Sequence, residues 1–375
     1  MSITNNTNLI EIIKAFPEFG TYVGYKPVTE GHINDTYVVE YVTENGTHVR
    51  YLLQRINVNV FKKPVEVMEN VCGVTSYLRE IIAKNGGDPT RETLTVYPAK
   101  DGKNYYIAED GGCWRMYNFV EDTYSINELT SPEDFRSAAL SFGNFQNQLA
   151  DYPIETLYET IPNFHNTPSR FRDFLEALDK NASGRKNAAK PEIEFVLARE
   201  NDCSVITDLL DSGDLPVRVT HNDTKLNNVL FDKKTNKGIC VVDLDTVMPG
   251  SSLYDFGDSI RFGANTAAED ETDLSKVSLN LEYFKAYVEG YLQTAGASLT
   301  ENEIKYLPFA AKLLTFECGI RFLGDFINGD VYFKIDYPEH NLVRARTQFK
   351  LVEDIESKYN EMVAIVDEAK ARILA

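Results

Sequence analysis

The chain lacks the features that mark exported, membrane-spanning or disulfide-stabilised proteins. No apolar run approaches the roughly 18 residues that cross a membrane, and residues 1–9 contain no basic or apolar signal region. The five cysteines lie far apart and form no C-x-x-C pair, which argues against both a structural zinc site and a disulfide framework. The sequence therefore predicts a soluble, cytoplasmic protein.

Positive charge is scarce as well. The 375 residues include 57 acidic and 38 basic side chains, so the net charge is −19. This excess of negative charge disfavours nucleic acid and anionic membranes as partners, and no feature of the sequence indicates a protein partner. A polyphosphate ligand must then be held by a metal ion and by local N–H groups. The length allows two domains.

One segment, residues 221–247, carries most of the functional information. Its first eight residues spell H-x-D-x-K-x-x-N, the spacing of a phosphoryl-transfer catalytic loop. In such a loop the aspartate, here Asp223, accepts the proton of the attacking hydroxyl, and the asparagine, here Asn228, binds magnesium. A predicted hairpin over residues 229–242 follows and leads to Asp243, which would be the second metal ligand. The alternative is a polar loop before an ordinary hairpin, because Asp, Asn and Thr are common turn residues.

This segment resembles the aminoglycoside phosphotransferase and choline kinase group of small-molecule kinases, which share the two-lobed protein-kinase fold. The resemblance runs from about Phe16 to the C-terminus. Longer strings are similar to the N-acetylhexosamine 1-kinase branch of that group: HNDTKLNN, VVDLDTVMPG, YDFGDSIRFGAN, RFLGDFINGDVYFK and HNLVRARTQFKLVE. The resemblance implies an α+β fold with a small, β-rich N-terminal lobe that binds the nucleotide and a larger, mostly helical C-terminal lobe. It also implies ATP and Mg²⁺ as cofactors.

The pattern of apolar residues divides the chain into two such lobes, residues 1–121 and 122–375. In the first lobe, a helix is expected from Pro64, and alternating apolar residues predict strands at 37–42, 49–56, 94–97, 105–108 and 113–120. In the second lobe, Ser131 and Pro132 predict a helix start with the serine as its cap. Further helices are expected at residues 170–179, 193–211, 281–294, 304–326 and 346–374.

Several residues of the first lobe are predicted to bind the nucleotide. The backbone of Asn118 and Val120, in the expected hinge between the lobes, would bind adenine along a free strand edge. A kinase also needs a cation on its third strand, paired with a glutamate of the following helix. Arg55 is the candidate cation, and Glu69 is its expected partner, with Glu66 second. The alternative is an exposed arginine beside a solvated helix face.

The turn at residues 29–36 is where the resemblance places the loop that covers the phosphates. It contains one glycine, Gly31, where protein kinases have three. The backbone is therefore less free to wrap around the phosphates, and side-chain contacts are expected from His32 or Asn34. An ordinary hairpin turn is the alternative.

Residues 255–257 spell Asp-Phe-Gly, the metal-binding string of protein kinases, but they lie well beyond the end of the predicted hairpin. Asp243 ends that hairpin, so we assign the metal contact to it. Asp245, expected on the same strand face, is a second possibility. The resemblance implies that Asp255 braces the catalytic loop.

Two further residues of the catalytic loop have expected roles. Lys225 would reach the γ-phosphate as a point charge, and His221 is expected to be a buried brace. The chain between Asp243 and Asp255 is too short for a long activation segment, and no Ala-Pro-Glu follows. A protein substrate is therefore disfavoured.

The acceptor is expected to be a sugar held by Arg321, Tyr332 and Phe262, which lie in or beside the strings that resemble the hexosamine kinases. A sugar site combines planar hydrogen-bonding groups with an aromatic face. The sequence thus predicts an ATP-dependent kinase of the anomeric hydroxyl of N-acetylglucosamine or N-acetylgalactosamine, with Asp223 as the base. Another small-molecule kinase of this fold, acting on an aminoglycoside, choline or a different sugar, is the alternative. A non-catalytic protein that only binds nucleotide is a second one.

Overall fold

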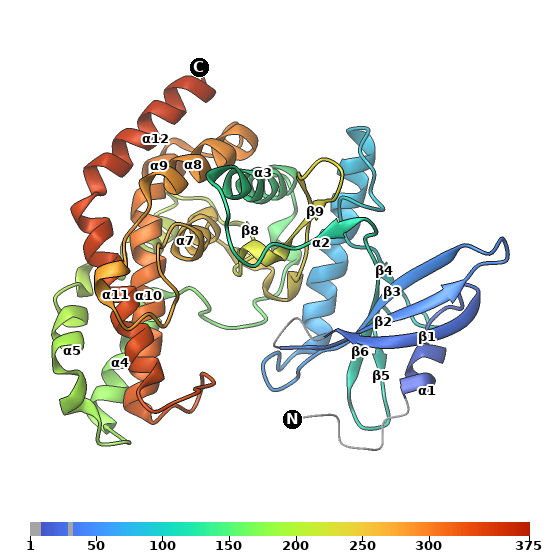
Figure 1. Ribbon diagram of the computed structural model, residues 1–375, viewed down its shortest axis with the longest axis horizontal. Coiled ribbons are helices and arrows are strands. Elements are labelled where there is room, and N and C mark those ends of the chain that lie inside the picture. The colour runs from blue at the N-terminus through green and yellow to red at the C-terminus, as the bar shows by residue number, and fades with distance from the viewer. Residues whose placement is uncertain (1–8, 29–32) are drawn as a thin grey trace. The chain divides into compact units, whose positions relative to one another are not determined.

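The computed structural model of the chain describes residues 9–28 and 33–375 (Figure 1). The chain forms two compact units: unit 1 comprises Met1–Tyr124, Asp151–Ile161 and Leu230–Met248, and unit 2 comprises Ser125–Ala150, Pro162–Val229 and Pro249–Ala375. The sequence predicts one change of lobe, at residues 121–122; the chain returns to unit 1 twice after residue 124. A β-rich unit 1 and a helical unit 2 confirm the predicted α+β class.

Unit 1 contains an antiparallel sheet in the order β1-β2-β3-β6-β4, with β5 paired to β6. Its strands and two helices are β1 (Thr21–Val28), β2 (Asp35–Val42), β3 (His48–Arg55), β4 (Val96–Tyr97), β5 (Tyr106–Ile107), β6 (Cys113–Asn118), α1 (Leu9–Lys14) and α2 (Pro64–Lys84). The strands predicted at 37–42 and 49–56 are confirmed as β2 and β3, which pair as an antiparallel hairpin. Its turn contains Gly46 at φ 80°, in the left-handed region that glycine enters without steric strain.

The two faces of this sheet carry different side chains, because successive residues of a strand point to opposite sides. On one face, Leu53 of β3 and Trp114 of β6 pack in a buried apolar core with Ile12 of α1. On the other face lies Arg115, whose guanidinium is 3.8 Å from the sulfur of Met68 in α2. Arg115 is 1% exposed, so the sheet buries a cation on its α2 side.

A second sheet of unit 1 has the order β10-β9-β7, with β7 (Thr123–Tyr124), β9 (Val229–Asp232) and β10 (Gly238–Val241). The hairpin predicted after the catalytic loop is confirmed as β9 and β10, but β10 ends before Asp243. Asp243 has a left-handed φ of 60° and leads into the 3₁₀ turn η5 (Leu244–Thr246). The expectation that Asp243 and Asp245 share a strand face is therefore wrong, since neither lies in a strand.

Unit 2 is mostly helical. Its helices are α3 (Pro132–Gln148), α4 (Thr167–Lys180), α5 (Lys190–Leu197), α6 (Val205–Asp211), α7 (Ser252–Gly263), α8 (Leu281–Ala295), α9 (Glu301–Lys305), α10 (Leu307–Asn328), α11 (His340–Ser357) and α12 (Tyr359–Ile373). The strand β8 (Arg218–Thr220) pairs with β11 (Met248–Gly250). Ser131 accepts a hydrogen bond from the Asp134 N–H at 3.2 Å, which confirms the predicted helix start.

Three of the predicted helices are divided in the structure. The stretch 193–211 is interrupted between α5 and α6, where residues 200–204 (Glu-Asn-Asp-Cys-Ser) include side chains that compete for backbone hydrogen bonds. The stretch 304–326 contains the end of α9 and most of α10. Pro308 lies in the first turn of α10, where proline is tolerated. The stretch 346–374 is two helices, α11 and α12.

The helix α10 is the central helix of unit 2 and packs against α4, α7 and α11. It is apolar on most sides, as expected for a buried helix. Three of its charged residues, Glu317, Arg321 and Asp325, are spaced four residues apart and so lie on one face. We call them the charged stripe. No helix in the described part of the chain is long and apolar enough to cross a bilayer.

Candidate active site

The catalytic loop follows β8 and is held by one carboxylate of α7. Asp255 accepts the N–H of His221 on Oδ2 at 2.9 Å and the N–H of Asn222 on Oδ1 at 2.7 Å. Its backbone oxygen accepts the hydroxyl of Thr224 at 2.6 Å. Asn222 has a φ of 64°, a conformation that asparagine tolerates better than most residues. These contacts confirm that Asp255 is a brace of the loop.

The rest of the Asp-Phe-Gly string serves helix packing. Phe256 is fully buried in the core of unit 2. A side chain at Gly257 would place its Cβ 2.4 Å from the backbone oxygen of Ala310, so glycine allows α7 to approach α10. The string is therefore a structural element inside a helix.

Asp223 is held at both carboxylate oxygens by residues of its own loop. Oδ1 lies 2.9 Å from Nζ of Lys225, and Oδ2 lies 3.4 Å from Nδ2 of Asn228. Nδ2 of Asn228 also donates to the backbone oxygen of Asp223 at 2.8 Å. Because the amide nitrogen of Asn228 is used within the loop, its Oδ1 is the end suited to a cation.

Lys225 sits between acidic and aromatic groups. Burial opposes its charge, but the carboxylates of Asp223 and Asp258 outweigh that effect and raise the pKa of the ammonium. Its Nζ lies 5.7 Å from the ring centre of Phe262. The Phe262 ring also lies 3.8 Å from the guanidinium of Arg261. The structure thus groups Phe262 with the catalytic loop.

Two buried residues of this site have no signal in the sequence pattern. Asp258, one turn before Arg261 on α7, accepts the N–H of Thr224 at 3.1 Å and the guanidinium of Arg261 at 3.0 Å. His165 has both ring nitrogens on acceptors, with Nδ1 2.8 Å from Oε1 of Glu317 and Nε2 3.2 Å from the oxygen of Asn222. Both nitrogens therefore donate, which requires the protonated ring.

The charge state of His165 follows from its partner. Burial alone would lower the pKa of the imidazole, but the Glu317 carboxylate outweighs it and raises the pKa above the ordinary value. The same pair keeps the pKa of Glu317 low despite its burial.

His221 is fully buried, and its ring lies 5.7 Å and 6.0 Å from the rings of Phe142 and Phe145. Its predicted place as a buried brace is confirmed.

In unit 1, Asp245 is occupied by protein contacts. Its Oδ1 accepts a hydrogen bond from the buried Arg115, and its Oδ2 accepts one from Nδ2 of Asn34 at 2.7 Å. Asp243 is exposed at the end of the β9–β10 hairpin. Of the two carboxylates, Asp243 is the one with the exposure that a metal ligand needs.

The pairing predicted for Arg55 is wrong. Arg55 lies 2.8 Å from Oδ2 of Asp110 and near the ring of Trp114, at 5.9 Å. It belongs to the sheet face that packs on α1, whereas Glu69 lies on α2 and contacts the hydroxyl of Tyr158. The cation that faces α2 is Arg115, from a different strand.

Three residues of the turn at 29–36 are predicted to bind the phosphates, and the structure describes one of them, Asn34. Gly31 and His32 lie outside the described residues. Asn34 uses both ends of its amide within the protein, since its Oδ1 accepts the N–H of Asn57 at 2.9 Å. The expected direct contact of the Asn34 side chain with phosphate is therefore not available in this arrangement.

The predicted free strand edge at the hinge is also partly wrong. The N–H of Asn118 donates to Thr95 at 3.1 Å, and that of Phe119 donates to Arg50 at 3.2 Å. The oxygen of Val120 accepts the hydroxyl of Thr123 at 2.8 Å. The sheet thus already uses the edge groups of Asn118, because β6 lies between β3 and β4.

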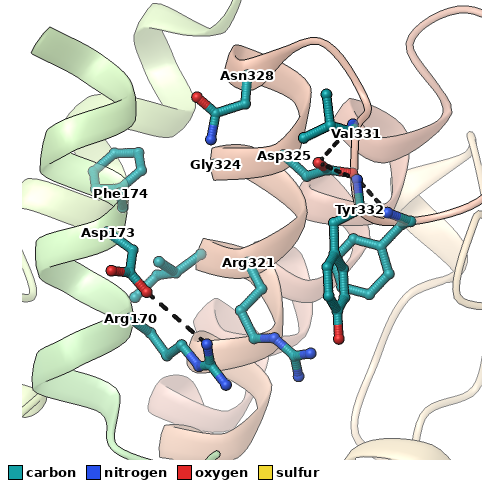
Figure 2. Close-up of a pocket in the computed structure, with 11 residues that line it drawn as sticks. Arg170, Asp173, Phe174, Arg321, Gly324, Asp325, Asn328, Val331 and Tyr332 are labelled. Atoms are coloured by element: carbon teal, nitrogen blue, oxygen red, sulfur yellow. Dashed lines mark hydrogen bonds and ion pairs between the residues drawn. The ribbon is translucent and has the colours of Figure 1, made fainter. Parts of the chain in front are cut away.

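A pocket of about 170 Å³ opens between α4, α10 and the segment 331–333 of unit 2. Figure 2 shows the side chains of Arg170, Arg321 and Tyr332 pointing in the same direction in it. The guanidinium of Arg321 lies 5.5–5.9 Å from the ring centres of Phe164, Tyr332 and Phe333. It makes no hydrogen bond or ion pair with any described residue. Two of the predicted acceptor residues, Arg321 and Tyr332, thus line one pocket.

The other charges of the pocket are engaged. Arg170 donates to the oxygen of Phe164 at 2.9 Å and lies 3.9 Å from Asp173. Burial, and after it the charge of Arg321, lower the pKa of Arg170. Asp325 accepts three backbone N–H groups, those of residues 331, 332 and 333, each at 2.9 Å. The charged stripe therefore reaches from His165, behind the catalytic loop, to the segment that carries Tyr332.

A comparison with known families agrees with this site. Residues 24–296 match the phosphotransferase enzyme family. The chain belongs to this family. An ethanolamine kinase from Drosophila melanogaster is 21% identical to this phosphotransferase over 196 residues, which are 51% of this chain and 37% of the relative. The match thus spans little more than a third of that curated relative.

Solved structures share the fold of this phosphotransferase. An aminoglycoside phosphotransferase from Alicyclobacillus acidocaldarius has a TM-score of 0.57 at 12% identity, with 96% of each chain covered. An amicoumacin kinase, solved with AMP-PNP and Ca²⁺, has a TM-score of 0.54 at 14% identity, with 95% of this chain and 94% of the other covered. At these identities the likeness establishes the fold alone.

Proposed function

We propose that this phosphotransferase is an ATP- and Mg²⁺-dependent kinase that phosphorylates the anomeric hydroxyl of N-acetylglucosamine or N-acetylgalactosamine. The observation that carries the choice of acceptor is the guanidinium of Arg321, which faces the pocket and makes no hydrogen bond or ion pair with the residues that the structure describes. A buried or half-buried guanidinium needs oxygen acceptors. The carbonyl of an acetamido group and the sugar hydroxyls supply them, and the ring of Tyr332 suits the C–H face of a sugar.

The same pocket disfavours an amine acceptor. The ethanolamine kinase and the aminoglycoside phosphotransferase named above bear the names of acceptors with amino groups. Arg170 and Arg321 would repel an ammonium group. Of the two carboxylates in the pocket, Asp325 is already occupied by three N–H groups, and Asp173 lies 3.9 Å from the guanidinium of Arg170. A neutral, oxygen-rich acceptor therefore fits the balance of charges better than an amine does.

The catalytic loop supports the proposed chemistry. Asp223 would take the proton of the C1 hydroxyl, which is more acidic than an ordinary alcohol and so suits a carboxylate base. Lys225, 2.9 Å from Asp223, keeps a positive charge beside the transferred group. Asn228, through Oδ1, and Asp243 would hold the metal, which neutralises charge on the phosphate oxygens when bound. The AMP-PNP and Ca²⁺ of the amicoumacin kinase structure support a nucleotide and a divalent cation.

The test is ADP release over a panel of acceptors at fixed MgATP: both N-acetylhexosamines, glucose, choline, ethanolamine and kanamycin. We expect turnover with the N-acetylhexosamines and, by ³¹P and ¹³C NMR, a product phosphorylated on C1. Asp223→Asn serves as the inactive control. Turnover of an amine in place of the sugars, or a phosphate on C6, would refute the assignment of the acceptor. Absence of ADP release with every acceptor would favour a non-catalytic nucleotide-binding protein.

A further inference from the structure

A buried ion pair of unit 1 lies directly behind the turn that carries Asp243. Arg115 donates to Asp245 and, at 3.1 and 2.9 Å, to Oε1 of Gln54. Arg115 and Asp245 are 1% and 3% exposed. Charges this deeply buried are stable only when they are paired and hydrogen-bonded, so each fixes the position of the other.

The pair is part of a ring of contacts that hydrogen bonds form and that the backbone of residues 34–36 closes. Asp245 accepts from Nδ2 of Asn34 at 2.7 Å, and Gln54 donates to the hydroxyl of Thr36 at 3.0 Å. Asn34 directly precedes β2, and Thr36 is the second residue of that strand. The ring therefore ties the start of β2, through β3 and β6, to the 3₁₀ turn η5, a stretch more than 200 residues later in the sequence.

Asp243 lies next to this ring in the chain, at the start of the 3₁₀ turn that contains Asp245. It is a non-glycine residue with a φ of 60°, a conformation that persists only when the surroundings hold it in place. Asp245 lies two residues farther on, and both of its carboxylate oxygens accept hydrogen bonds from other parts of unit 1. The positive charge of Arg115 also acts on Asp243 itself. A loosened Asp245 would therefore loosen the turn that sets the position of Asp243.

We propose that Asn34, Arg115 and Asp245 are positioning residues that hold Asp243 for the metal–nucleotide complex, a role that rests on the proposed function. Asp245 then supports the metal ligand and does not bind metal itself. Asn34 acts through Asp245 and not by touching phosphate. The network serves the nucleotide side of the reaction, so its loss affects MgATP and leaves the acceptor pocket of unit 2 unchanged.

The test compares Asn34→Ala and Asp245→Asn with the wild type. Asn34 is partly exposed, so Asn34→Ala is expected to fold. Loss of a hydrogen bond to a charged group corresponds to roughly a tenfold or larger effect. We expect MgADP affinity, measured by calorimetry without acceptor, to fall about tenfold or more in each variant. The KM for MgATP should rise accordingly, while the KM for the acceptor changes less than about twofold. The double variant should be less than additive, because the residues act as one unit.

Glu303→Gln is the matched control for a merely structural effect. Glu303 is fully buried and paired with Arg218 in unit 2, so its variant should melt earlier with unchanged MgADP affinity. Asn34→Ala and Asp245→Asn variants that melt earlier but bind MgADP like the wild type would overturn the positioning role. A wild type that does not bind MgADP at all would instead overturn the proposed function.

Discussion

Arg321→Ala is the substitution that most directly tests the acceptor pocket. The Arg321 guanidinium has no acceptor within residues 9–28 and 33–375. Its neighbour Glu317 stays paired with His165 and with Thr167, at 2.6 Å. Removal of Arg321 therefore leaves no buried carboxylate without a partner, and stability should change little. A bound sugar loses one charge-assisted hydrogen bond, about 1.5–3 kcal/mol. We expect kcat/KM for the sugar to fall about 10- to 150-fold.

The assay is steady-state ADP release with each substrate varied in turn. The sugar KM should rise, whereas the KM for ATP should stay within about twofold, because Arg321 lines the pocket that we propose for the acceptor. Arg172→Ala is the matched control, since Arg172 is an exposed arginine of α4 that does not line the pocket. It should leave both constants unchanged.

Three results would refute this reasoning. A sugar KM untouched by Arg321→Ala would show that the guanidinium does not meet the acceptor. An equal rise in the KM for ATP would show that Arg321 acts on the nucleotide or on the fold. A melting temperature far below that of the wild type would contradict the claim that the guanidinium has no structural partner.

Three further predictions concern the catalytic loop. Asp223→Asn should keep MgADP binding and lose turnover by about 100-fold or more; near-normal turnover would show that another group is the base. Asn228→Ala and Asp243→Ala should each abolish Mg²⁺-dependent activity, whereas Asp255→Ala mainly lowers stability, by roughly 1–3 kcal/mol for each N–H left without an acceptor. Loss of metal binding in Asp255→Ala at an unchanged melting temperature would return the metal to the Asp-Phe-Gly string. The raised pKa of His165 means that its ion pair stabilises the fold fully below its unfolded pKa of about 6.5 and less as the pH rises through the folded value. The difference in unfolding free energy between wild type and His165→Gln should therefore shrink toward alkaline pH in urea titrations, and a difference that grows with pH would contradict the assignment.

Local spacing was sufficient to predict the catalytic loop and the helix cap at Ser131, because both depend on residues within a few positions. The brace role of Asp255 was predicted through family resemblance, and the contacts bear it out. Local spacing does not show which of two neighbouring strand residues faces the helix that covers the sheet. Arg55 and Gln54 are adjacent in β3, and only the packing of Leu53 against α1 decides that Arg55 points away from α2. The sequence pattern alone contains no such information.

The ion pairs that sequence reasoning missed join residues that lie far apart in the sequence. His165 and Glu317 are 152 positions apart, and Arg115 and Asp245 are 130 apart. Each looks unremarkable in its own segment. A charged residue inside an otherwise apolar helix, as Glu317 and Asp325 are in α10, is the one local signal that indicates such a partner.

The charged stripe of α10 has a consequence for how the acceptor range of this enzyme can evolve. One turn of an α-helix advances 5.4 Å, and a helix packed on most sides cannot slide. If Arg321 holds the acceptor as proposed, its distance along the helix from Glu317, which lies behind the catalytic loop, can change only by whole turns. Selection for a longer acceptor should relocate the gripping side chain by a whole turn, to position 324 or 325, in a single abrupt change of specificity. Substitutions that only widen the pocket should lower the rate without creating a new preference.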